Sequence, residues 1–581
     1  MTTIGFRLGV ALAALTIGLA ACGGGHEKPP SYTVGTSHAG VPGERTPGEA
    51  GVAGGAPSQR TTFLLSSAHG GFPNGPSRNA AVSHDQRIAR YMAYESDASN
   101  IVAGDTNGQT DVFLVARAQP FGANGTPWKP AGTQLISKGG GAAPANGPSY
   151  RPVIDGDSHH APHCVAFVSE ASNLVEGDTN GKSDGFVYDT RSRHIARVTV
   201  DSAGNQSNGS TYDISISGDC TRVAFTSDAT NLALTKASNA AWSKATTTAV
   251  RPGTRQVYVH VLSGSGLDTA FKGLTFLASA ANNGVAGNRD SQGADIARSG
   301  KAVVFASTAT NLARGDKTPA SDVYRRTIVR KFERMDGKGI QTLQGVVGLA
   351  SATRSDKAGN GPSSHPTVTD DGRYVAFETD ASNLLPGDNN GVSDIVRADM
   401  RTGEPRQQWV SNTAVGGIGN GASHDPVISD AGEFILFDSE ASNLRPSNAV
   451  HPDSNGVEDV FLWNAPTRNV SLESRDANNG YLSSPSQHPA TSSRGNYVPF
   501  ESANPLIDVP LATQLFPQLA QEPKVVDLSL LPQLSNPDVP APQLAKVTGS
   551  KPAADPSSMD DLAKAAASAG QQVYVRYLGA K

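Results

Sequence analysis

One pattern of apolar and polar positions recurs seven times along the chain. Each copy begins with an apolar, β-branched stretch that ends in an aromatic residue, continues with small polar residues and usually closes on Asn-Leu. The copies span residues 91–101, 165–174, 223–232, 303–312, 375–384, 435–444 and, in degenerate form, 498–506. Because one internal repeat corresponds to one supersecondary unit, the pattern predicts seven equivalent units.

Four strand-like segments can be recognised in each unit. In the second unit they cover residues 151–155, 164–168, 185–188 and 196–200. Each segment is short, rich in β-branched or aromatic residues, and bounded by Gly, Asn or Asp, as expected for strands between turns. Four antiparallel strands repeated radially form a β-propeller. The predicted fold is therefore all-β, a single seven-bladed β-propeller of four-stranded blades over residues 60–581.

The two ends of the repeat region complement each other. No fourth segment follows the third one of the last unit before Lys581, while a lone strand-like segment precedes the first unit. We predict that this N-terminal strand, at about residues 60–66, joins the last blade and closes the ring. The last unit also carries a Pro- and Leu-rich insertion at about residues 505–570, in which residues 557–568 have the capping pattern of a short helix.

The N-terminus has the features of an export signal. The apolar run at residues 8–21 is too short and too rich in small residues to be a membrane span. It ends Leu19-Ala-Ala-Cys-Gly23, which resembles the bacterial lipoprotein signal. This resemblance implies a signal peptide at 1–21 and lipid attachment at Cys22, and it places the chain in the bacterial cell envelope. An ordinary secretory signal is the alternative.

The expected location follows from the same resemblance. If the organism is Gram-negative, the lipid would anchor the chain to the outer membrane, on its periplasmic or its surface side. Residues 22–59 are rich in Gly, Pro, Ser and Ala, cannot bury a core, and are interpreted as a flexible tether.

Composition supports an all-β fold and excludes one class of partner. Hydrophobic residues make up 37% of the chain and charged residues 17%, with 62 glycines. The net charge of −5 and the absence of a basic block exclude nucleic acid as a partner. Apart from Cys22, the only cysteines are Cys164 and Cys220, at apolar strands of neighbouring units. Export permits a disulfide between them, although two buried free thiols are the simpler interpretation.

Two stretches resemble a known group of repeats. The sequences Asp370-Asp-Gly-Arg-Tyr-Val-Ala-Phe377 and Gly177-Asp-Thr-Asn-Gly181 are similar to the TolB-type, WD-like propeller repeats of bacterial envelope proteins. The resemblance extends over most of residues 60–510 and the C-terminal strand. TolB carries an additional α/β domain before its propeller, whereas only the tether stands at that place here. The resemblance therefore implies the fold, and it says little about the function.

An acidic loop follows Asn-Leu, or Asn-Ile in the first unit, in four units, with Asp, Asn and Asp at its first, third and seventh positions. These residues are Asp105, Asn107 and Asp111; Asp178, Asn180 and Asp184; Asp388, Asn390 and Asp394; and Asp453, Asn455 and Asp459. Their oxygen atoms could bind calcium, which is the one cofactor that we consider. The alternative is turn chemistry, in which Asn-Gly provides a positive φ and Asp accepts hydrogen bonds from the backbone. A fourth-unit variant at 316–322 keeps both acids without Asn-Gly.

A second set of polar residues lies just after the lead-in loop of each unit, which often reads Asn-Gly-x-Ser. Up-and-down connectivity places the lead-in and acidic loops on one face, and the first strands line the central channel. The roughly equivalent positions hold Asn79, Arg151, Asp213, Asp295, His365, Asp425 and His488, with Arg78 beside the first. We expect a polar ring at the channel mouth, where a small ligand or metal could bind. A wet channel mouth without a ligand is the alternative.

The absence of several catalytic and cofactor-binding motifs excludes some classes of enzyme. The sequence contains no G-x-S-x-G, no His-Glu-x-x-His, no paired-Cys zinc spacing and no P-loop. We expect a monomeric, non-catalytic binding or scaffold lipoprotein that uses one propeller face to bind an envelope protein or a glycan and contacts the membrane through its lipid. The alternative is a propeller enzyme, a glycan hydrolase or lyase with carboxylates on that face. A pair of acids with perturbed pKa values in a deep cleft would favour the enzyme.

Overall fold

The computed structural model contains seven four-stranded sheets and one separate two-stranded sheet. The described residues are 61–68, 73–85, 88–119, 128–139, 143–232, 249–262, 273–335, 338–401, 406–413, 416–445, 453–475, 482–503 and 570–578. Within these ranges no helix is long and apolar enough to cross a membrane. The predicted signal peptide, Cys22, the tether and the insertion with its short helix lie outside the described residues.

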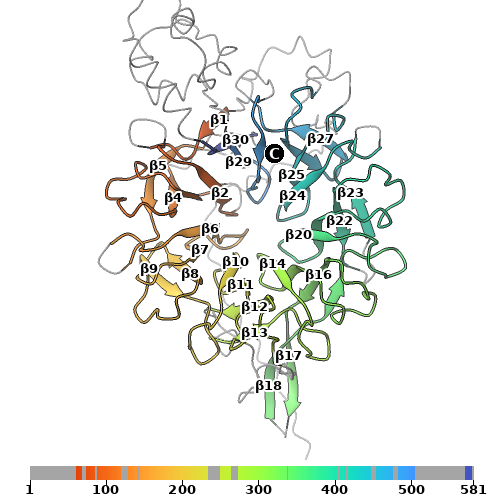
Figure 1. Ribbon diagram of the computed structural model, residues 1–581, viewed down its shortest axis with the longest axis horizontal. Coiled ribbons are helices and arrows are strands. Elements are labelled where there is room, and N and C mark those ends of the chain that lie inside the picture. The colour runs from red at the N-terminus through yellow and green to blue at the C-terminus, as the bar shows by residue number, and fades with distance from the viewer. Residues whose placement is uncertain are drawn as a thin grey trace, which may run out of the picture. The chain divides into compact units, whose positions relative to one another are not determined.

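Each four-stranded sheet is one blade, with its strands in chain order from the axis outward in blades 1 to 6 (Figure 1). The innermost strands are β2 (Ser77–Val82), β6 (Ser149–Ile154), β10 (Thr211–Ile216), β14 (Ser291–Ile296), β20 (Ser363–Val368), β24 (Ser423–Ile428) and β28 (Ser486–Gln487). The second strands are β3 (Tyr91–Ser96), β7 (Cys164–Ser169), β11 (Arg222–Ser227), β15 (Ala302–Ser307), β21 (Tyr374–Thr379), β25 (Phe434–Ser439) and β29 (Tyr497–Ser502).

The two outer strands complete every blade. The third strands are β4 (Asp111–Arg117), β8 (Asp184–Asp189), β12 (Gln256–Val261), β16 (Asp322–Thr327), β22 (Asp394–Asp399), β26 (Asp459–Asn464) and β30 (Gln572–Tyr577). The outermost strands are β5 (Pro130–Leu135), β9 (His194–Arg197), β13 (Thr275–Leu277), β19 (Val347–Leu349), β23 (Arg406–Trp409), β27 (Asn469–Leu472) and, in blade 7, β1 (Thr61–Leu64).

The N-terminal strand closes the ring as predicted. Strand β1 pairs antiparallel with β30, so that Thr61 lies opposite Tyr577 and Leu64 lies opposite Tyr574. The backbone N–H of Leu65 extends the pairing by donating to the carbonyl of Val573 at 2.9 Å. The seven-bladed propeller of four-stranded blades, closed by the first strand, is therefore confirmed.

The repeated phrase forms the second strand of each blade, and its aromatic residue anchors the core. In six blades this ring contacts an aromatic ring opposite it on the third strand, with ring centroids 5.6–6.2 Å apart. Apolar side chains of neighbouring blades bury each other; one cluster joins Val257 and Phe276 of blade 3 to Val303 and Phe305 of blade 4. Because the core lies between blades, the ring holds every blade in place.

The asparagine near the end of the phrase has a structural role in six blades. Its side-chain oxygen accepts a hydrogen bond from the backbone N–H of the lead-in Asn of the same blade, as in Asn173 with Asn146 at 3.0 Å. The same bond occurs at Asn100, Asn231, Asn311, Asn383 and Asn443. This bond ties the loop that leads into the first strand to the loop that leaves the second.

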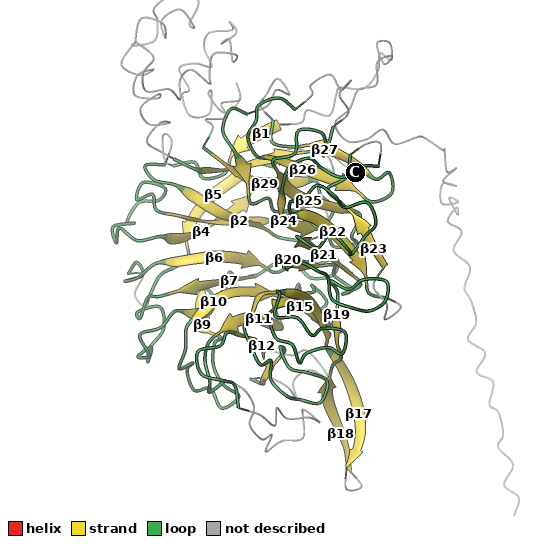
Figure 2. Cartoon of the chain, turned by 45° about the vertical axis from the view of Figure 1, so that its right-hand side comes forward, coloured by secondary structure: helices red, strands yellow, loops and turns green. Residues whose placement is uncertain are grey.

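Two features of the fold differ from the sequence interpretation. Cys164 and Cys220 form a disulfide, so the interpretation as free thiols is wrong. The bond joins the start of β7 to the turn before β11 of the next blade. In blade 4, the connection from β16 to β19 forms a hairpin of β17 (Val329–Met335) and β18 (Lys338–Gln344), which extends away from the ring (Figures 1 and 2). The repeat pattern did not predict this hairpin.

Candidate functional site

The innermost strands carry the residues predicted at the channel mouth, and a β-bulge sets most of their positions. Register shifts interrupt the pairing of the first two strands, for example between Arg78 and Ala81. The residues at the corresponding position have positive φ values of 46–67°: Asn79, Arg151, Gly293, His365, Asp425 and His488. Asp295 lies two residues beyond this position, which Gly293 occupies in blade 4. Side chains other than Gly rarely adopt this conformation unless the surroundings enforce it.

Carboxylates of the preceding blade supply part of that enforcement. The backbone N–H of Asn79 donates to Glu501, and that of Arg151 to Glu95, both at 2.6 Å. The N–H of His488 donates to Asp438 at 2.9 Å. A charged acceptor makes these hydrogen bonds strong. The second strand of one blade thereby fixes the bulge of the next.

Two predicted mouth residues have a similar bridging role. Asp213 accepts hydrogen bonds from the N–H groups of Gly293 at 3.0 Å and Ala294 at 3.3 Å. Asp295 accepts one from Val368 at 3.0 Å. Both carboxylates therefore connect blades through the backbone. Arg78, by contrast, pairs within its own blade, with Glu95 at 2.9 Å and Asp97 at 3.1 Å.

Blades 5 to 7 bring the remaining mouth residues into one chain of alternating bases and acids. Nδ1 of His365 lies 3.0 Å from Oε2 of Glu378 and 3.9 Å from Oδ1 of Asp425. Nε2 of His488 lies 3.3 Å from Oδ2 of Asp425, and its Nδ1 lies 3.2 Å from Oε2 of Glu501. The sequence positions span more than 130 residues, and only the ring brings them together.

His424 extends this chain at one end, where its Nδ1 lies 3.5 Å from Oε2 of Glu378. At the other end, the amide of Gln571 donates to Oε2 of Glu501 at 2.7 Å. We refer to six of these residues as the axial cluster: His365, Glu378, His424, Asp425, His488 and Glu501. The side chain of Glu501 is 1% exposed and that of His365 is 60% exposed, so the cluster has a buried acidic back and an open front of histidines.

The electrostatics of the axial cluster follow from these pairs. Hydrogen bonds to Glu378 and Glu501 raise the pKa of His424 and of His488, respectively, to about 9. Burial would raise the pKa of Glu378, but hydrogen bonds from His365 and His424 outweigh it and lower that pKa to about 2. Burial also raises the pKa of the adjacent Asp438 to about 7. The histidines therefore lie beside one carboxyl group with a lowered pKa, Glu378, and one with a raised pKa, Asp438.

The axial cluster contains a donor set that suits a metal ion. His365, Glu378 and Asp425 each offer one ligand atom, and these atoms lie within 4.8 Å of one another. Imidazole nitrogen and carboxylate oxygen together are common ligands of divalent first-row metals. Glu378 was not among the predicted site residues. An acidic residue directly after the phrase aromatic, present at Glu95, Glu378, Asp438 and Glu501, was the sequence signal for it.

The acidic loops show a repeated set of internal hydrogen bonds. The side-chain amide of the middle Asn donates to the last Asp, as in Asn107 to Asp111 at 2.7 Å, and to a carbonyl of the following lead-in loop. The bonds to the last Asp recur from Asn180, Asn390 and Asn455. These are the bonds that the turn interpretation expects. Calcium in these loops stays a prediction.

The close pairs of acids in blade 2 and in the variant loop of blade 4 have different surroundings. In blade 2, Nη1 of Arg197 lies 3.2 Å from Asp178 and 3.7 Å from Asp184. In the variant loop of blade 4, Asp322 is 1% exposed, and its Oδ1 accepts a hydrogen bond from Ser351 at 2.7 Å. Its Oδ2 is buried without a hydrogen-bond partner among the described residues. Burial, with the charge of Asp316, raises the pKa of Asp322 to about 7.

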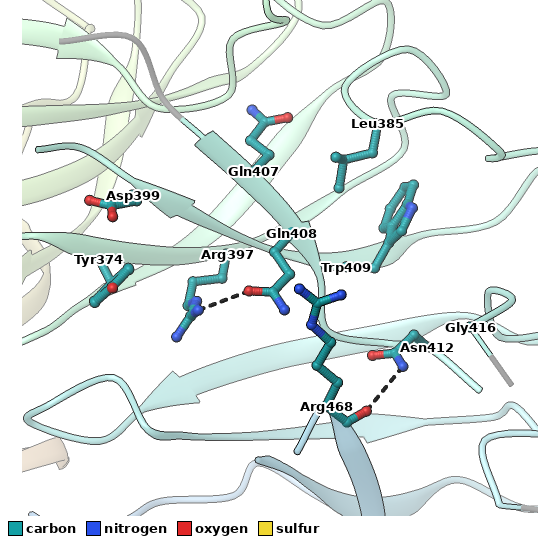
Figure 3. Close-up of a pocket in the computed structure, with 10 residues that line it drawn as sticks. All are labelled: Tyr374, Leu385, Arg397, Asp399, Gln407, Gln408, Trp409, Asn412, Gly416 and Arg468. Atoms are coloured by element: carbon teal, nitrogen blue, oxygen red, sulfur yellow. Dashed lines mark hydrogen bonds between the residues drawn. The ribbon is translucent and has the colours of Figure 1, made fainter. Parts of the chain in front are cut away.

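A separate groove of about 420 Å³ lies on the outer strands of blades 5 and 6 (Figure 3). Arg397 donates to Gln408 at 2.8 Å and stacks on Tyr374, with its guanidinium 4.4 Å from the ring centroid. Trp409 also lines the groove. The sequence signal was that Trp409 occupies a position where Leu stands in four other blades: Leu135, Leu277, Leu349 and Leu472.

Comparisons with known proteins agree with the fold and do not extend to the function. No family model matches the chain, and no curated protein matches its sequence. Solved structures that are similar to it include TolB from Acinetobacter baumannii, at 14% identity and a TM-score of 0.32, covering 70% of this chain and 67% of that one. An oligogalacturonate lyase in complex with manganese has 11% identity and a TM-score of 0.38, covering 77% and 88%.

A third similar structure is the β-propeller domain of the Trilobed protease from Pyrococcus furiosus. It has 10% identity and a TM-score of 0.36, covering 75% of this chain and 90% of that one. At these identities the likeness concerns the fold alone.

Proposed function

We propose that the chain is a binding lipoprotein of the bacterial cell envelope, whose axial cluster binds a divalent transition-metal ion and presents it to an envelope protein or a glycan. The observation that carries this proposal is the chain of three histidines and three carboxylates at the mouth of blades 5 to 7. An ion held there by His365, Glu378 and Asp425 would keep open positions toward the exposed front. A partner with anionic or carbonyl oxygen atoms could complete its coordination.

One hydrogen bond of the axial cluster lies where the proposed ion would bind. A proton between Nδ1 of His365 and Oε2 of Glu378, 3.0 Å apart, fills part of the space that a cation would take. Metal binding displaces such protons, because an imidazole must be neutral to act as a ligand. At the neighbouring blade, the N–H of His488 donates to Asp438 at 2.9 Å and fixes the bulge beside the proposed ligands.

Metal titration of the oxidised protein by calorimetry tests this proposal. We expect wild type to bind one equivalent of Mn²⁺ or Zn²⁺, and His365→Asn, which tolerates the positive φ, to bind at least about 10-fold more weakly. His194→Ala, at an exposed histidine of β9, is the matched control and should bind as wild type does. Equal affinity of His365→Asn and wild type would disprove the site. A Ca²⁺ arm that responds to Asp388→Asn instead would place calcium in the acidic loops.

The anchoring is tested separately by fractionation. The small residues before Cys22 are the basis of the proposed lipid attachment, and acyl chains hold a soluble domain at a membrane surface. We expect the chain to sediment with membranes and the variant Cys22→Ser to move to the soluble fraction. A variant that remains with the membranes to the same extent would contradict a lipid anchor at this residue.

One observation favours a second candidate, a glycan hydrolase or lyase that uses the same face. The pKa of Glu378 is lowered to about 2 while that of Asp438 is raised to about 7, and both groups act on His424. Carboxyl groups with pKa values driven apart are typical of acid–base pairs. Incubation with acidic and neutral polysaccharides would reveal new reducing ends or unsaturated uronates. Activity that Glu378→Gln abolishes would support the enzyme, and its absence across the panel would exclude it for those substrates.

A further inference from the structure

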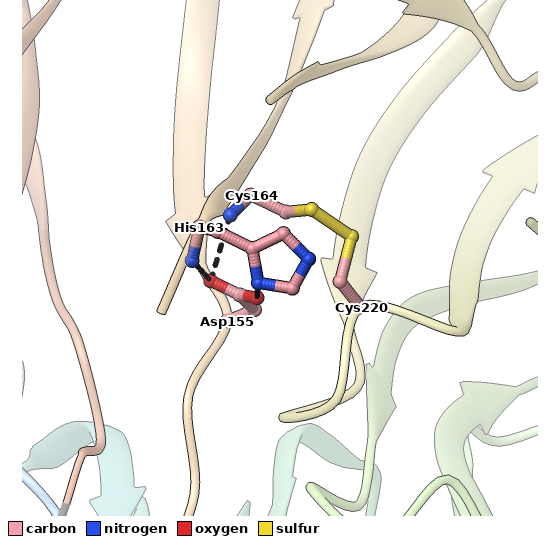
Figure 4. Close-up of side chains that lie close together, drawn as sticks. All are labelled: Asp155, His163, Cys164 and Cys220. Carbon is pink, nitrogen blue, oxygen red and sulfur yellow. Dashed lines mark hydrogen bonds and ion pairs between the residues drawn. A yellow bond between two sulfur atoms is a disulfide. The ribbon is translucent and has the colours of Figure 1, made fainter. Parts of the chain in front are cut away.

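A second cluster of possible metal ligands lies where blade 2 meets blade 3, around the disulfide (Figure 4). Cys164 begins β7, and His163 directly precedes it. Cys220 lies in the turn between β10 and β11 of the next blade, at a φ of 53°. The Cα atoms of the two cysteines are 6.1 Å apart. All of these residues are outside the axial cluster.

Asp155 holds His163 in a fixed orientation beside the sulfur atoms. Its Oδ1 accepts hydrogen bonds from the backbone N–H groups of His163 at 2.8 Å and Cys164 at 2.9 Å. Its Oδ2 lies 3.1 Å from Nδ1 of His163. The side chain of Asp155 is fully buried, and that of His163 is 19% exposed. The imidazole is therefore positioned from one side and reachable from solvent on another.

The other ring nitrogen of His163 is available as a ligand. Nε2 has no hydrogen-bond partner among the described residues, and Figure 4 shows it on the side of the ring that faces Cys220. One ring nitrogen, one carboxylate oxygen and both sulfur atoms lie within 4.8 Å of one another. A carboxylate on one nitrogen of a histidine and a metal on the other is the usual arrangement around zinc.

We propose that reduction of the disulfide converts this corner into a zinc site, with Cys164, Cys220 and His163 as ligands and Asp155 as the positioning residue. Thiolate sulfur and imidazole nitrogen are the donors that zinc prefers. Two Zn–S bonds of about 2.3 Å at a tetrahedral angle place the sulfur atoms about 3.8 Å apart. Rotation of the two side chains supplies this separation at the present Cα distance. A water molecule completes the fourth position on the exposed side.

The chemistry balances with a dithiol as the reductant. The dithiol gives two hydrogen atoms to the protein disulfide, which becomes two cysteine thiols, and is itself oxidised to a cyclic disulfide. Zn²⁺ then replaces the two thiol protons, which leave to solvent. Blades 2 and 3 are thus linked covalently in the oxidised chain and through the metal in the reduced chain. The inter-blade bond from Gly156 N–H to the Gly218 carbonyl, at 2.9 Å, is independent of this exchange.

Cobalt is a suitable probe, because thiolate ligation of Co²⁺ produces a charge-transfer absorption that the axial cluster, which lacks sulfur, cannot produce. The full chain with Cys22→Ser has Cys164 and Cys220 as its only cysteines. We expect this chain, after anaerobic reduction, to bind one equivalent of Co²⁺ with that absorption and to exchange it for Zn²⁺. The oxidised chain should show no such absorption.

Variants at the two supporting residues separate a ligand from a bystander. His163→Gln should weaken Co²⁺ binding by at least about 10-fold, and Asp155→Asn should weaken it by about 10- to 100-fold while keeping the charge-transfer band. His160→Gln is the matched control, because His160 pairs with Asp157 in the same loop and should leave binding unchanged. Equal affinities of His163→Gln and wild type would overturn the proposal.

A folding control distinguishes a missing zinc site from unfolding of the reduced chain. Near-ultraviolet circular dichroism compares the reduced chain before and after Zn²⁺. If the reduced chain keeps its tertiary signal, its two thiols react with a thiol reagent and Zn²⁺ fails to protect them, the site does not exist. If the reduced chain loses that signal, restoration by Zn²⁺ supports the proposal and lack of restoration contradicts it.

Discussion

Deletion of residues 60–66 should leave a chain that aggregates at concentrations where the intact protein does not. The deletion removes β1 and exposes the hydrogen-bonding edge of β30, and an unprotected edge pairs readily with other chains. It also removes Leu64 and Leu65, each 2% exposed, and the ring of Phe63, which stacks on Trp128 at a centroid distance of 5.8 Å. Loss of these buried groups and of the strand pairing should lower the free energy of unfolding by about 5 kcal/mol or more.

Light scattering and thermal unfolding of the deletion variant measure this effect. Deletion of residues 51–57 in the tether removes the same number of residues outside the predicted propeller and is the matched control. The closure would be unimportant for stability if the chain lacking 60–66 were monodisperse and unfolded at the temperature of the control.

Replacement of Asp322 by Asn should stabilise the protein at alkaline pH. The pKa of Asp322 rises from 3.8 to about 7 because the carboxyl group is buried. The folded state therefore binds this proton more tightly than the unfolded state, and stability falls as the pH rises from about 4 to about 7. A shift of this size corresponds to about 4 kcal/mol at most. We expect Asp322→Asn, which carries no charge, to be more stable than wild type by about 2–4 kcal/mol at pH 8.

Chemical unfolding at several pH values tests this expectation. The difference between Asp322→Asn and wild type should grow between pH 4 and pH 7 and then remain constant. Asp356→Asn is the control, because Asp356 is an exposed acid in the following lead-in segment, at a φ of 57° that Asn also adopts. A constant difference at all pH values would show that Asp322 does not titrate with folding.

The strand pattern was predictable because it depends on neighbouring residues. The short apolar run Val165-Ala-Phe167 and the turn residues around it define a second strand locally, and repetition supplies the blade count. The closing strand was predictable for the same reason, since residues 61–65 match the missing segment. Asp295 was assigned to the mouth as a roughly equivalent position just after Ser291, but it lies two residues beyond the bulge position, which Gly293 occupies.

The sites depend on contacts between blades, which a linear pattern does not encode. His365 and His488 belong to different repeats and meet only through Asp425. Cys164 and Cys220 are 56 residues apart. Their pairing requires the turn between β10 and β11 of blade 3 to lie beside the start of β7 of blade 2. The hairpin of β17 and β18 falls outside the repeat, so counting repeats could not reveal it.

Because of the left-handed bulge, the axial residues of the propeller can be substituted without a change of fold. The residues at the six bulge positions are absent from the hydrophobic clusters that the described residues form between blades, and the backbone N–H of four of them donates to a carboxylate of the preceding blade. The bulge positions of this chain hold five residue types: Asn, Arg, Gly, His and Asp. A new recognition surface can therefore arise from single substitutions at the bulge positions, while the propeller that carries these positions keeps its fold.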